Sequence, residues 1–524
     1  MSGRKRLRRR VKRLGNTAQR SLGLSSNSAP AITARVKAGE EHFVPDDPRA
    51  LWVGDRPLEE YLRAHDLAWV VRLRTLLEEL DWGPLLAAYQ GEGRKALHPR
   101  TMLGLIVYGM LNRQWSLREL EGLARRDVAA WWLCGGNQPD HSTIGKFIQL
   151  HSEVLSEEYF LCLVSQLSKK LKLQAGTAAG DGTVIEAAAS HFKALRAEAA
   201  VQAAQELAAQ AAQAPADQEL QQQAAAAGAV AEMAQERVAE RKAHGRDPAA
   251  VLIVPGEPQA VVQQGKDGRN RPSYKPSTLV HQAGLIVAQW VEPSSEVAAL
   301  TPLLAQHGRA FGALPQRLLM DAGYLCLPVL KLAVECDLDL LCPAGKGLHP
   351  KRAPAHGRFP KEAFVYQPEE DAYLCPAGQR LMCFQQAAGR RGRAYKRYRT
   401  GQCASCSLRG QCTTASGRTI KRYGGDELKE LMAAVLGQSA ARKEYSKRKA
   451  IVEPPFAELR ERQGLKRFHR RHLRGVRVEF SLHCMAFNLK RAVGAPAFTL
   501  VLLYFGRGPR SLGQLVGLAV VTAY

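Results

Sequence analysis

Three acidic residues stand in segments that suggest metal chemistry. Asp181 lies in "GDGTVIEAAAS" after small residues, Asp321 lies in "LLMDAGYL" after an apolar run, and Glu453 lies in "AIVEPPFAELR" beside two prolines. Acids at the ends of adjacent strands, joined by one from a helix, can hold divalent cations, and Mg²⁺ prefers carboxylate oxygens. Two such ions roughly 3.5–4 Å apart activate an attacking oxygen and stabilise a leaving one. Taken singly, each acid is weak evidence, because aspartate at a strand end commonly forms a turn or caps a helix.

The elements around these acids predict an α/β layer with a mixed sheet. Residues 277–291 are rich in β-branched and apolar residues and are interrupted by Ala283-Gly284, which predicts a β-hairpin, and 296–307 predict a helix with Gly308 just past its end. A short buried strand then ends at Asp321, and a helix and another strand follow it. The helix that carries Glu453 is expected to have its two prolines in the first turn, where a missing N–H costs least.

The segment 46–170 predicts several short helices. Ser116 and Glu119 have the spacing of a capping box, and Asp140 or Ser142 is expected to cap the helix that follows Pro139. Short helices joined by tight turns fit a helix-turn-helix-like DNA-binding domain. A plain helical bundle that only supports the next domain is the alternative.

Three further segments are predicted from composition. Residues 1–45 form a basic, flexible leader, and residues 491–524 an apolar tail to which no chemistry is assigned. Residues 196–242 are rich in Ala, Gln and Glu and predict a pair of helices broken near Pro215 and Gly228. A dimerising coiled coil is an alternative there, although the heptad pattern is poor.

The charge of the chain points to a polyanionic partner. Lys and Arg number 74 against 49 Asp and Glu, a formal net charge of +25. Nucleic acid is the first candidate, since neutralising phosphates releases counterions; a basic solubility face or a ribosome-associated protein is the alternative. Between Arg442 and Arg477 there are 13 Lys or Arg and four acids, and the part from Arg462 to Arg477 contains no acid. We expect this stretch to contact phosphates.

Five of the 11 cysteines lie between 375 and 412. Cys403 and Cys406 have the spacing of a zinc knuckle, and Cys375 with Cys412 would complete a tetrahedral thiolate site. The alternative is a set of small buried thiols. Cys383 fits the site least well.

We expect neither a membrane span nor a secretion signal. The longest uncharged stretches, 492–506 and 511–524, fall short of the 18 or so residues that a span needs. The basic N-terminus has no apolar h-region. Cysteine usage without a secretion signal favours a reducing cytoplasm.

In combination, these blocks resemble bacterial DDE transposases of the insertion-sequence-1182 family, within the insertion-sequence-4-like superfamily. The resemblance rests on "DGTVIEAAAS", "MDAGYL" and "YSKRKAIVEPPFAELR", on the helical block "RTMLGLIVYGMLNRQWSLRELE", on the Cys-rich insertion and on "HCMAFNLKR". It covers roughly residues 45–490. It implies an RNase H-like mixed-sheet catalytic core in two parts, 171–345 and 426–490, with a helical N-terminal DNA-binding domain at 46–170 and a Cys-rich insertion at 346–425.

The resemblance also implies a site. Asp181, Asp321 and Glu453 would be catalytic and would bind two Mg²⁺ ions, with Mn²⁺ as a substitute. The implied partners are double-stranded DNA, as terminal inverted repeats and target, and a second copy on paired ends; the implied location is the bacterial cytoplasm at the nucleoid. The side chains expected to contact DNA are Tyr445, Arg448, Lys449, Arg460, Lys466, Arg467, Arg470 and Arg471.

The family signature is altered here. The usual Tyr-x2-Arg-x3-Glu-x6-Lys becomes Tyr445-x2-Arg448-x4-Glu453-x6-Arg460. The longer spacing leaves Arg448 and Lys449 as alternatives for the basic side chain at the transferred strand.

Three rival functions remain. The first is a catalytically inactive, domesticated transposase that binds DNA, against which the presence of all three acids argues. The second is a metal-dependent nuclease that cuts without joining. The third is a zinc-stabilised nucleic-acid scaffold in which the acids are incidental.

Overall fold

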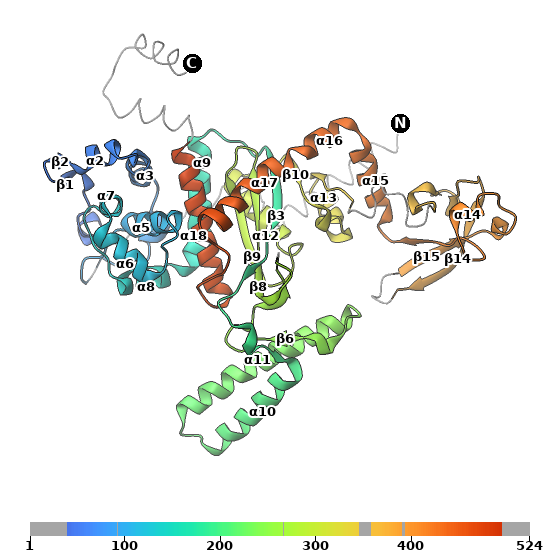
Figure 1. Ribbon diagram of the computed structural model, residues 1–524, viewed down its shortest axis with the longest axis horizontal. Helices are drawn as coiled ribbons and strands as arrows, with labels where there is room; N and C mark the ends of the chain where they lie inside the picture. Colours follow the sequence, from blue (N-terminus) through green and yellow to red (C-terminus); the bar gives the residue numbers. More distant parts are fainter. Residues whose placement is uncertain (1–38, 92, 266, 345–357, 390–393, 495–524) are drawn as a thin grey trace, which may run out of the picture.

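The computed structural model describes residues 39–494 except 92, 266, 345–357 and 390–393. Most of the basic leader and of the apolar tail lie outside the described residues. Figure 1 shows a helical region, a central sheet, a projecting helical hairpin and a small second sheet.

The N-terminal region is helical, as predicted. The Ser116–Glu119 capping box forms, and Asp140 rather than Ser142 caps the helix after Pro139, accepting from the Thr143 N–H at 2.6 Å. The helices are α2 (Leu58–Ala64), α3 (Ala68–Glu78), α4 (Gly83–Leu86), α5 (Pro99–Leu111), α6 (Leu117–Arg126), α7 (Val128–Cys134), α8 (His141–Leu150) and α9 (Tyr159–Lys170), with a π-helical turn at Val154–Glu158 before α9.

A seven-stranded mixed sheet occupies the centre. Strands β3, β10 and β11 are parallel to one another, and β8 runs antiparallel to both β3 and β9. The predicted hairpin is β8–β9. The strands are β3 (Thr177–Gly182), β4 (Ile185–Glu186), β7 (Val261–Gln264), β8 (Asn270–His281), β9 (Ile286–Glu292), β10 (Arg317–Leu319) and β11 (Asp339–Leu341).

Two helices connect these strands. Helix α12 (Leu300–Phe311) joins β9 to β10, and α13 (Leu327–Glu335) joins β10 to β11. The prediction that α12 ends before Gly308 was wrong: Gly308 is buried inside it, and the left-handed cap is Gly312, with φ of 71°. A buried glycine in a packed helix can serve close packing as well as a terminus.

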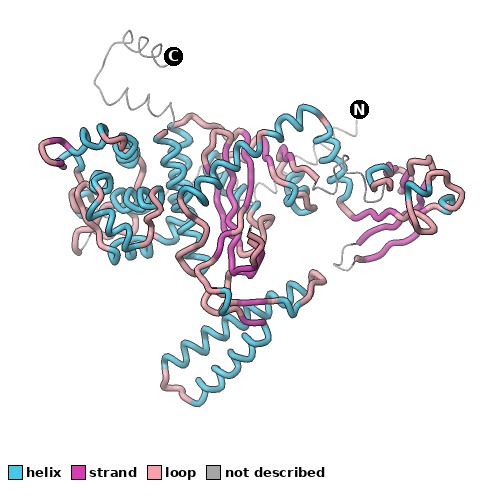
Figure 2. Tube along the Cα trace, in the orientation of Figure 1, coloured by secondary structure: helices cyan, strands magenta, loops and turns pink. Residues whose placement is uncertain are grey.

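The Ala/Gln-rich insertion forms two antiparallel helices that project from the central sheet, cyan in Figure 2. They are α10 (Ala197–Gln213) and α11 (Gln218–Ala243), with the short pair β5 (Leu195–Arg196) and β6 (Leu252–Ile253) at their base. The break at Pro215 is as predicted. The break at Gly228 is not, because α11 continues through it; one glycine inside a helix costs only about 1 kcal/mol.

The Cys-rich segment contains a five-stranded antiparallel sheet. Its strands are β12 (Val365–Gln367), β13 (Ala372–Leu374), β14 (Arg380–Ala388), β15 (Ala394–Arg399) and β16 (Ile420–Tyr423). Its own core is small, with five buried apolar or aromatic side chains: Phe364, Tyr373, Leu381, Tyr398 and Ile420.

Four helices complete the described chain. They are α15 (Asp426–Gly437), α16 (Ser439–Ser446), α17 (Arg448–Ala457) and α18 (His472–Val493). The prediction that Pro454 and Pro455 lie in a first turn was wrong: both are inside α17. Neither can donate to the carbonyl four residues earlier, and a π-helical turn, Glu458–Arg462, follows the helix. Helix α18 packs against α3, α5, α9 and β9, so it joins the N-terminal helices to the sheet.

A buried carboxylate organises the N-terminal helices. Asp46 is 8% exposed and accepts from Arg74 at 3.1 Å, from Arg100 at 2.5 and 3.0 Å and from Thr101 at 2.7 Å. Burial raises the pKa of Asp46, but the hydrogen bonds from Arg100 and Thr101 and the charge of Arg74 outweigh it, so the pKa is lowered.

We expect Asp46→Asn to destabilise the protein by about 3–5 kcal/mol at pH 7, because the buried guanidinium of Arg74 and the half-buried one of Arg100 lose the anion that they share. Because the folded pKa is depressed, this stabilisation is present above the ordinary pKa of 3.8 and is lost as pH falls through the folded value. Urea unfolding at pH 7 and at successively lower pH measures the difference. Glu59→Gln, which removes an exposed pair with Arg63, is the control and should change stability by less than about 1 kcal/mol. An Asp46→Asn effect that is independent of pH would contradict the assignment.

Candidate active site

Asp181 and Asp321 lie at the ends of neighbouring parallel strands. Asp181 is the fifth residue of β3, and Asp321 follows β10 by two residues. The register pairs Leu319 with Ala179, which brings the two carboxyl ends to one edge of the sheet. The Asp321 carboxylate accepts from the Gly323 N–H at 2.8 Å and caps a short 3-10 turn, Ala322–Tyr324. The structure therefore brings together two of the three predicted acids.

The Asp181 carboxylate is in a partly buried, charged environment. Burial raises its pKa, and the neighbouring carboxylates of Asp321 and Glu296 raise it further; the guanidinium of Arg448 and the N–H of Gly182 act in the opposite sense. The net pKa of Asp181 is raised. Neighbouring carboxylates oppose each other's ionisation, and a bound cation would relieve that repulsion.

Arg448 supplies the nearest positive charge. Its Nη2 lies 3.2 Å from Asp181 Oδ1 and donates to the Gly180 carbonyl at 2.9 Å. The side chain is buried, while that of Lys449 is exposed. Of the two alternatives left by the altered spacing, the structure places Arg448 at the acids.

The third predicted acid, Glu453, is not joined to this pair. Its side chain is exposed, and no hydrogen bond or ion pair links its carboxylate to another described residue. It follows Arg448 by five positions on α17, which rotates it by roughly 140° about the helix axis. Val452, four positions after Arg448, is on the buried side instead. Arg448 and Glu453 thus occupy different faces of α17.

Two of the other basic side chains bind the loop after Asp181. Arg460 donates to the Thr183 hydroxyl at 2.7 Å and to the Val184 carbonyl at 3.0 Å. Arg467 donates to the carbonyls of Ala187 and Ala189. These contacts hold the loop and leave fewer donors for another ligand.

The remaining predicted contact residues divide by exposure. Arg471 and Lys466 are exposed, and Lys466 pairs with Glu461 at 2.8 Å. Arg470 is half-buried, and burial lowers its pKa. Tyr445 is half-buried near Asp321 and Asp181, and burial raises its pKa.

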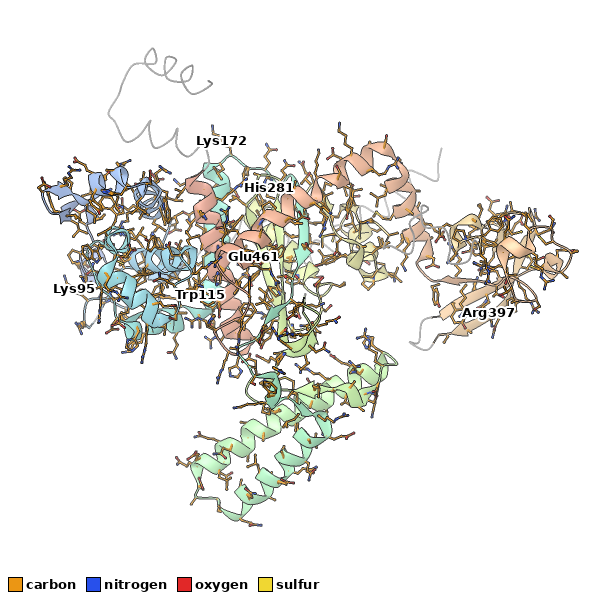
Figure 3. All side chains as sticks on the ribbon, viewed as in Figure 1. Lys95, Trp115, Lys172, His281, Arg397 and Glu461 are labelled. Carbon is orange, nitrogen blue, oxygen red and sulfur yellow. The ribbon has the colours of Figure 1, made fainter. Side chains whose placement is uncertain are left out.

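A polar pocket lies where the N-terminal helices meet the segment after α17. Arg113 donates to the Arg462 carbonyl at 2.9 Å, and the Trp115 indole donates to the Gln463 carbonyl at 3.3 Å. Figure 3 shows Trp115 and Glu461 near the centre of the molecule. The pocket is lined by Arg113, Trp115, Ser116, Glu119, Arg460, Glu461, Gln463, Gly464, Lys466 and His469.

Sequence reasoning missed three polar residues beside the two aspartates: Glu296, Ser277 and Tyr324. Burial raises the pKa of Tyr324, and the carboxylates of Glu296, Asp321 and Asp181 add to the shift. Glu296 follows the predicted hairpin by a few residues, as Asp321 follows its strand. This position shortly after a strand was the sequence signal that could have indicated Glu296.

Four of the five clustered cysteines line one pocket: Cys375, Cys403, Cys406 and Cys412. Cys375 Sγ accepts from the Gln379 N–H at 3.3 Å. Burial raises the pKa of the Cys412 thiol, and Cys403, Cys375 and Cys406 raise it further. Cys383, on β14, does not line the pocket. The donor set has the thiol chemistry of a zinc site.

No group of three or more His, Cys, Asp or Glu side chains among the described residues is arranged to hold a metal ion. Zinc binding therefore stays a prediction, as does metal binding at the acids. None of the described helices combines the length and apolar composition that crossing a bilayer requires.

Two family models match the chain. One, described as a transposase DDE domain, matches residues 374–493, and the other, described as a transposase domain (DUF772), matches residues 57–150. Together the matches support a DDE transposase. The first covers the five clustered cysteines, Arg448 and Glu453; neither covers Asp181 or Asp321. The comparisons with curated proteins and with solved structures found no match.

We expect the purified protein to contain about one zinc ion per chain, because the Cys-rich sheet has a small core and thiolate ligation would stabilise it. Cys403→Ser and Cys406→Ser should lose the metal, and Cys383→Ser should retain it. Mass spectrometric metal analysis of protein prepared without chelators measures the content. Zinc-free wild-type protein, or a Cys403→Ser variant that keeps its zinc, would show that the thiols are merely buried neighbours.

Proposed function

We propose that this chain is a DNA transposase of the insertion-sequence-1182 type, which cleaves DNA at the ends of its element and joins them to target DNA. The observation that carries the proposal is the pair of carboxylates, Asp181 and Asp321, at the adjacent ends of β3 and β10. The two transposase-domain matches on either side of that pair support it.

The strand arrangement supports an RNase H-like core. Following the order β9-β8-β3-β10-β11, three antiparallel strands are succeeded by two parallel ones. Helices α12 and α13 make the crossovers to the parallel strands. Asp181 lies on the central strand, and Asp321 follows the neighbouring parallel strand. At these adjacent strand ends two acids can share one substrate.

The acids fit a divalent cation in their chemistry. Carboxylate oxygens are the ligands that Mg²⁺ prefers. The guanidinium of Arg448 already lies beside Asp181, so the surroundings of this carboxylate accommodate positive charge. Bound Mg²⁺ would activate the attacking oxygen and neutralise charge on the phosphate in both cleavage and joining. The chain's own part is to hold Asp181 and Asp321 in register and to position the DNA end.

The basic side chains would supply DNA affinity. Exposed residues such as Lys449, Lys466 and Arg471 are available to phosphates, and such contacts orient a duplex without reading its sequence. Readout of terminal repeats falls to the N-terminal helices in this proposal. Two copies would act on paired ends, in the bacterial cytoplasm at the nucleoid.

The decisive experiment follows a marked element that carries the gene's flanking DNA. Wild-type protein with Mg²⁺ should excise and join the marker, and Asp181→Asn, Asp321→Asn and Glu453→Gln should each reduce both steps by about 1,000-fold, the upper range for loss of a charge-stabilising group. Binding to end DNA, measured by gel shift, should survive each change. Wild-type protein that binds the ends without cutting would be an inactive relic, and cutting without joining would indicate a nuclease.

Arg448 and Lys449 allow a matched comparison. Arg448→Gln should lower end cleavage by about 100-fold with little change in DNA affinity, because its guanidinium contacts Asp181. Lys449→Gln should instead weaken DNA binding and reduce the salt dependence of binding by about one phosphate contact. Cleavage at saturating DNA, DNA affinity across salt concentrations and thermal unfolding midpoints separate the two. A cleavage defect confined to Lys449→Gln would reverse the assignment.

A further inference from the structure

The five-stranded sheet of the Cys-rich segment has two unlike faces. Side chains that are directly paired on antiparallel strands project to the same face, so the strand register assigns each one to a face. Leu381, Tyr398 and Ile420 lie together on the face that forms the small core. Leu381 also lines the cysteine pocket, so the pocket belongs to this core face. The residues that alternate with these form the opposite face, which we call the outer face.

The outer face combines positive charge with exposed apolar and aromatic side chains. None of the five strands contains an Asp or Glu. Met382 is 52% exposed and Phe384 is 39% exposed, although both are large apolar residues. The register places on this face Arg380, Met382, Tyr395, Arg397, Arg399 and Lys421. An exposed surface of this composition is complementary to a polyanion that also has apolar parts.

Phe384 reaches the outer face through a β-bulge. The register between β14 and β15 shifts between Cys383 and Gln385, so Phe384 is the extra residue, and bulges redirect side chains in this way. The guanidinium carbon of Arg399 lies 4.3 Å from the centroid of the Phe384 ring, and that of Arg397 lies 5.3 Å from it. Arg397 also donates to the Gln385 side chain at 2.8 Å. The ring therefore lies among the cations of the outer face.

Three cations of the outer face are not neutralised by a carboxylate. Arg380 pairs with Glu370 at 3.2 Å. Arg397, Arg399 and Lys421, in contrast, form no ion pair with an acid among the described residues. Arg399 and Lys421 are exposed and Arg397, labelled in Figure 3, is half-buried. Their positive charge is available to a ligand in solution.

A single strand of DNA matches this combination better than a duplex. A duplex is held mainly through its phosphates, for which cations suffice. A single strand also exposes the faces of its bases, which stack on aromatic side chains beside a cationic track. The sheets of common RNA-binding modules present aromatic residues to bases in the same way. Phe384, and Tyr395 with the Lys421 ammonium 4.9 Å from its ring centroid, provide such aromatic surfaces.

We propose that the outer face of the five-stranded sheet binds single-stranded DNA. Bases stack on Phe384 and Tyr395, and phosphates contact Arg397, Arg399 and Lys421. Cleavage separates the element from its flanking DNA, and the unpaired nucleotides at that end are the strand assigned to this face; this assignment rests on the proposed function. The N-terminal helices and the exposed cations of the segment after α17 remain the parts that bind duplex.

Fluorescence anisotropy of a labelled oligothymidylate of about 16 nucleotides measures the affinity of the full chain for a single strand. Phe384→Leu should weaken binding by about fivefold and Phe384→Trp should retain it, because stacking requires a ring. Arg397→Gln combined with Arg399→Gln should reduce the slope of log affinity against log salt concentration by about 1.4, the value for two phosphate contacts on a single strand. Lys242→Gln, which removes an exposed cation of α11, is the control and should match the wild type.

The outcomes separate this proposal from the proposed function. An excess of unlabelled duplex should leave oligothymidylate binding in place, and thermal unfolding midpoints should show that each variant is folded. Binding that duplex abolishes, or a folded Phe384→Leu variant with wild-type affinity, would overturn the assignment of the outer face and leave the proposed function standing. A chain that binds the single strand through Phe384 but never cuts end DNA would overturn the proposed function and leave the outer face standing.

Discussion

The close pairing of β3 with its neighbours is the constraint on which the candidate site depends. Residues 178–180, Ala-Ala-Gly, are buried, and a Cβ on Gly180 would stand 2.4 Å from the sulfur of Met320 and 3.0 Å from Leu279. Small residues let β8 and the segment after β10 approach β3 from both sides. Because β3 and β10 are held in one register, the aspartates that follow them share one edge of the sheet.

Arg448 transmits that constraint to the C-terminal segment. It bonds the Gly180 carbonyl and Asp181 across 268 residues of sequence, so α17 is attached to the central strand at the site itself. Arg460 and Arg467 extend the attachment along the loop after Asp181. Much of the basic character of this segment is thus used inside the protein. A guanidinium suits this use, since its planar fork of donors matches carbonyls and carboxylates.

Helix α18, at the end of the same segment, connects the central sheet to the N-terminal helices. Its Asn488 side chain donates to the Ile286 carbonyl at 2.7 Å and accepts from the Ile286 N–H at 2.9 Å, which satisfies the backbone at the start of β9. The same helix also packs on the N-terminal helices α3, α5 and α9. The two insertions, α10–α11 and the five-stranded sheet, project from this joined body, and Arg397 marks the second of them in Figure 3. Surface connections tolerate such insertions because long loops add little closure entropy.

The sequence by itself determined the local elements: the capping box at Ser116, the β8–β9 hairpin, the helical pair around Pro215 and the strand ends at Asp181 and Asp321. Each depends on residues close together in the chain. It misplaced Gly308 and the two prolines of α17, because packing and neighbouring turns overrode local preference. Only the tertiary structure decided that Arg448 rather than Lys449 meets Asp181, that Glu453 is exposed and that Glu296 lies at Gly182. Those contacts join residues more than 100 positions apart, and their geometry follows from strand register and helix rotation, which no local pattern contains.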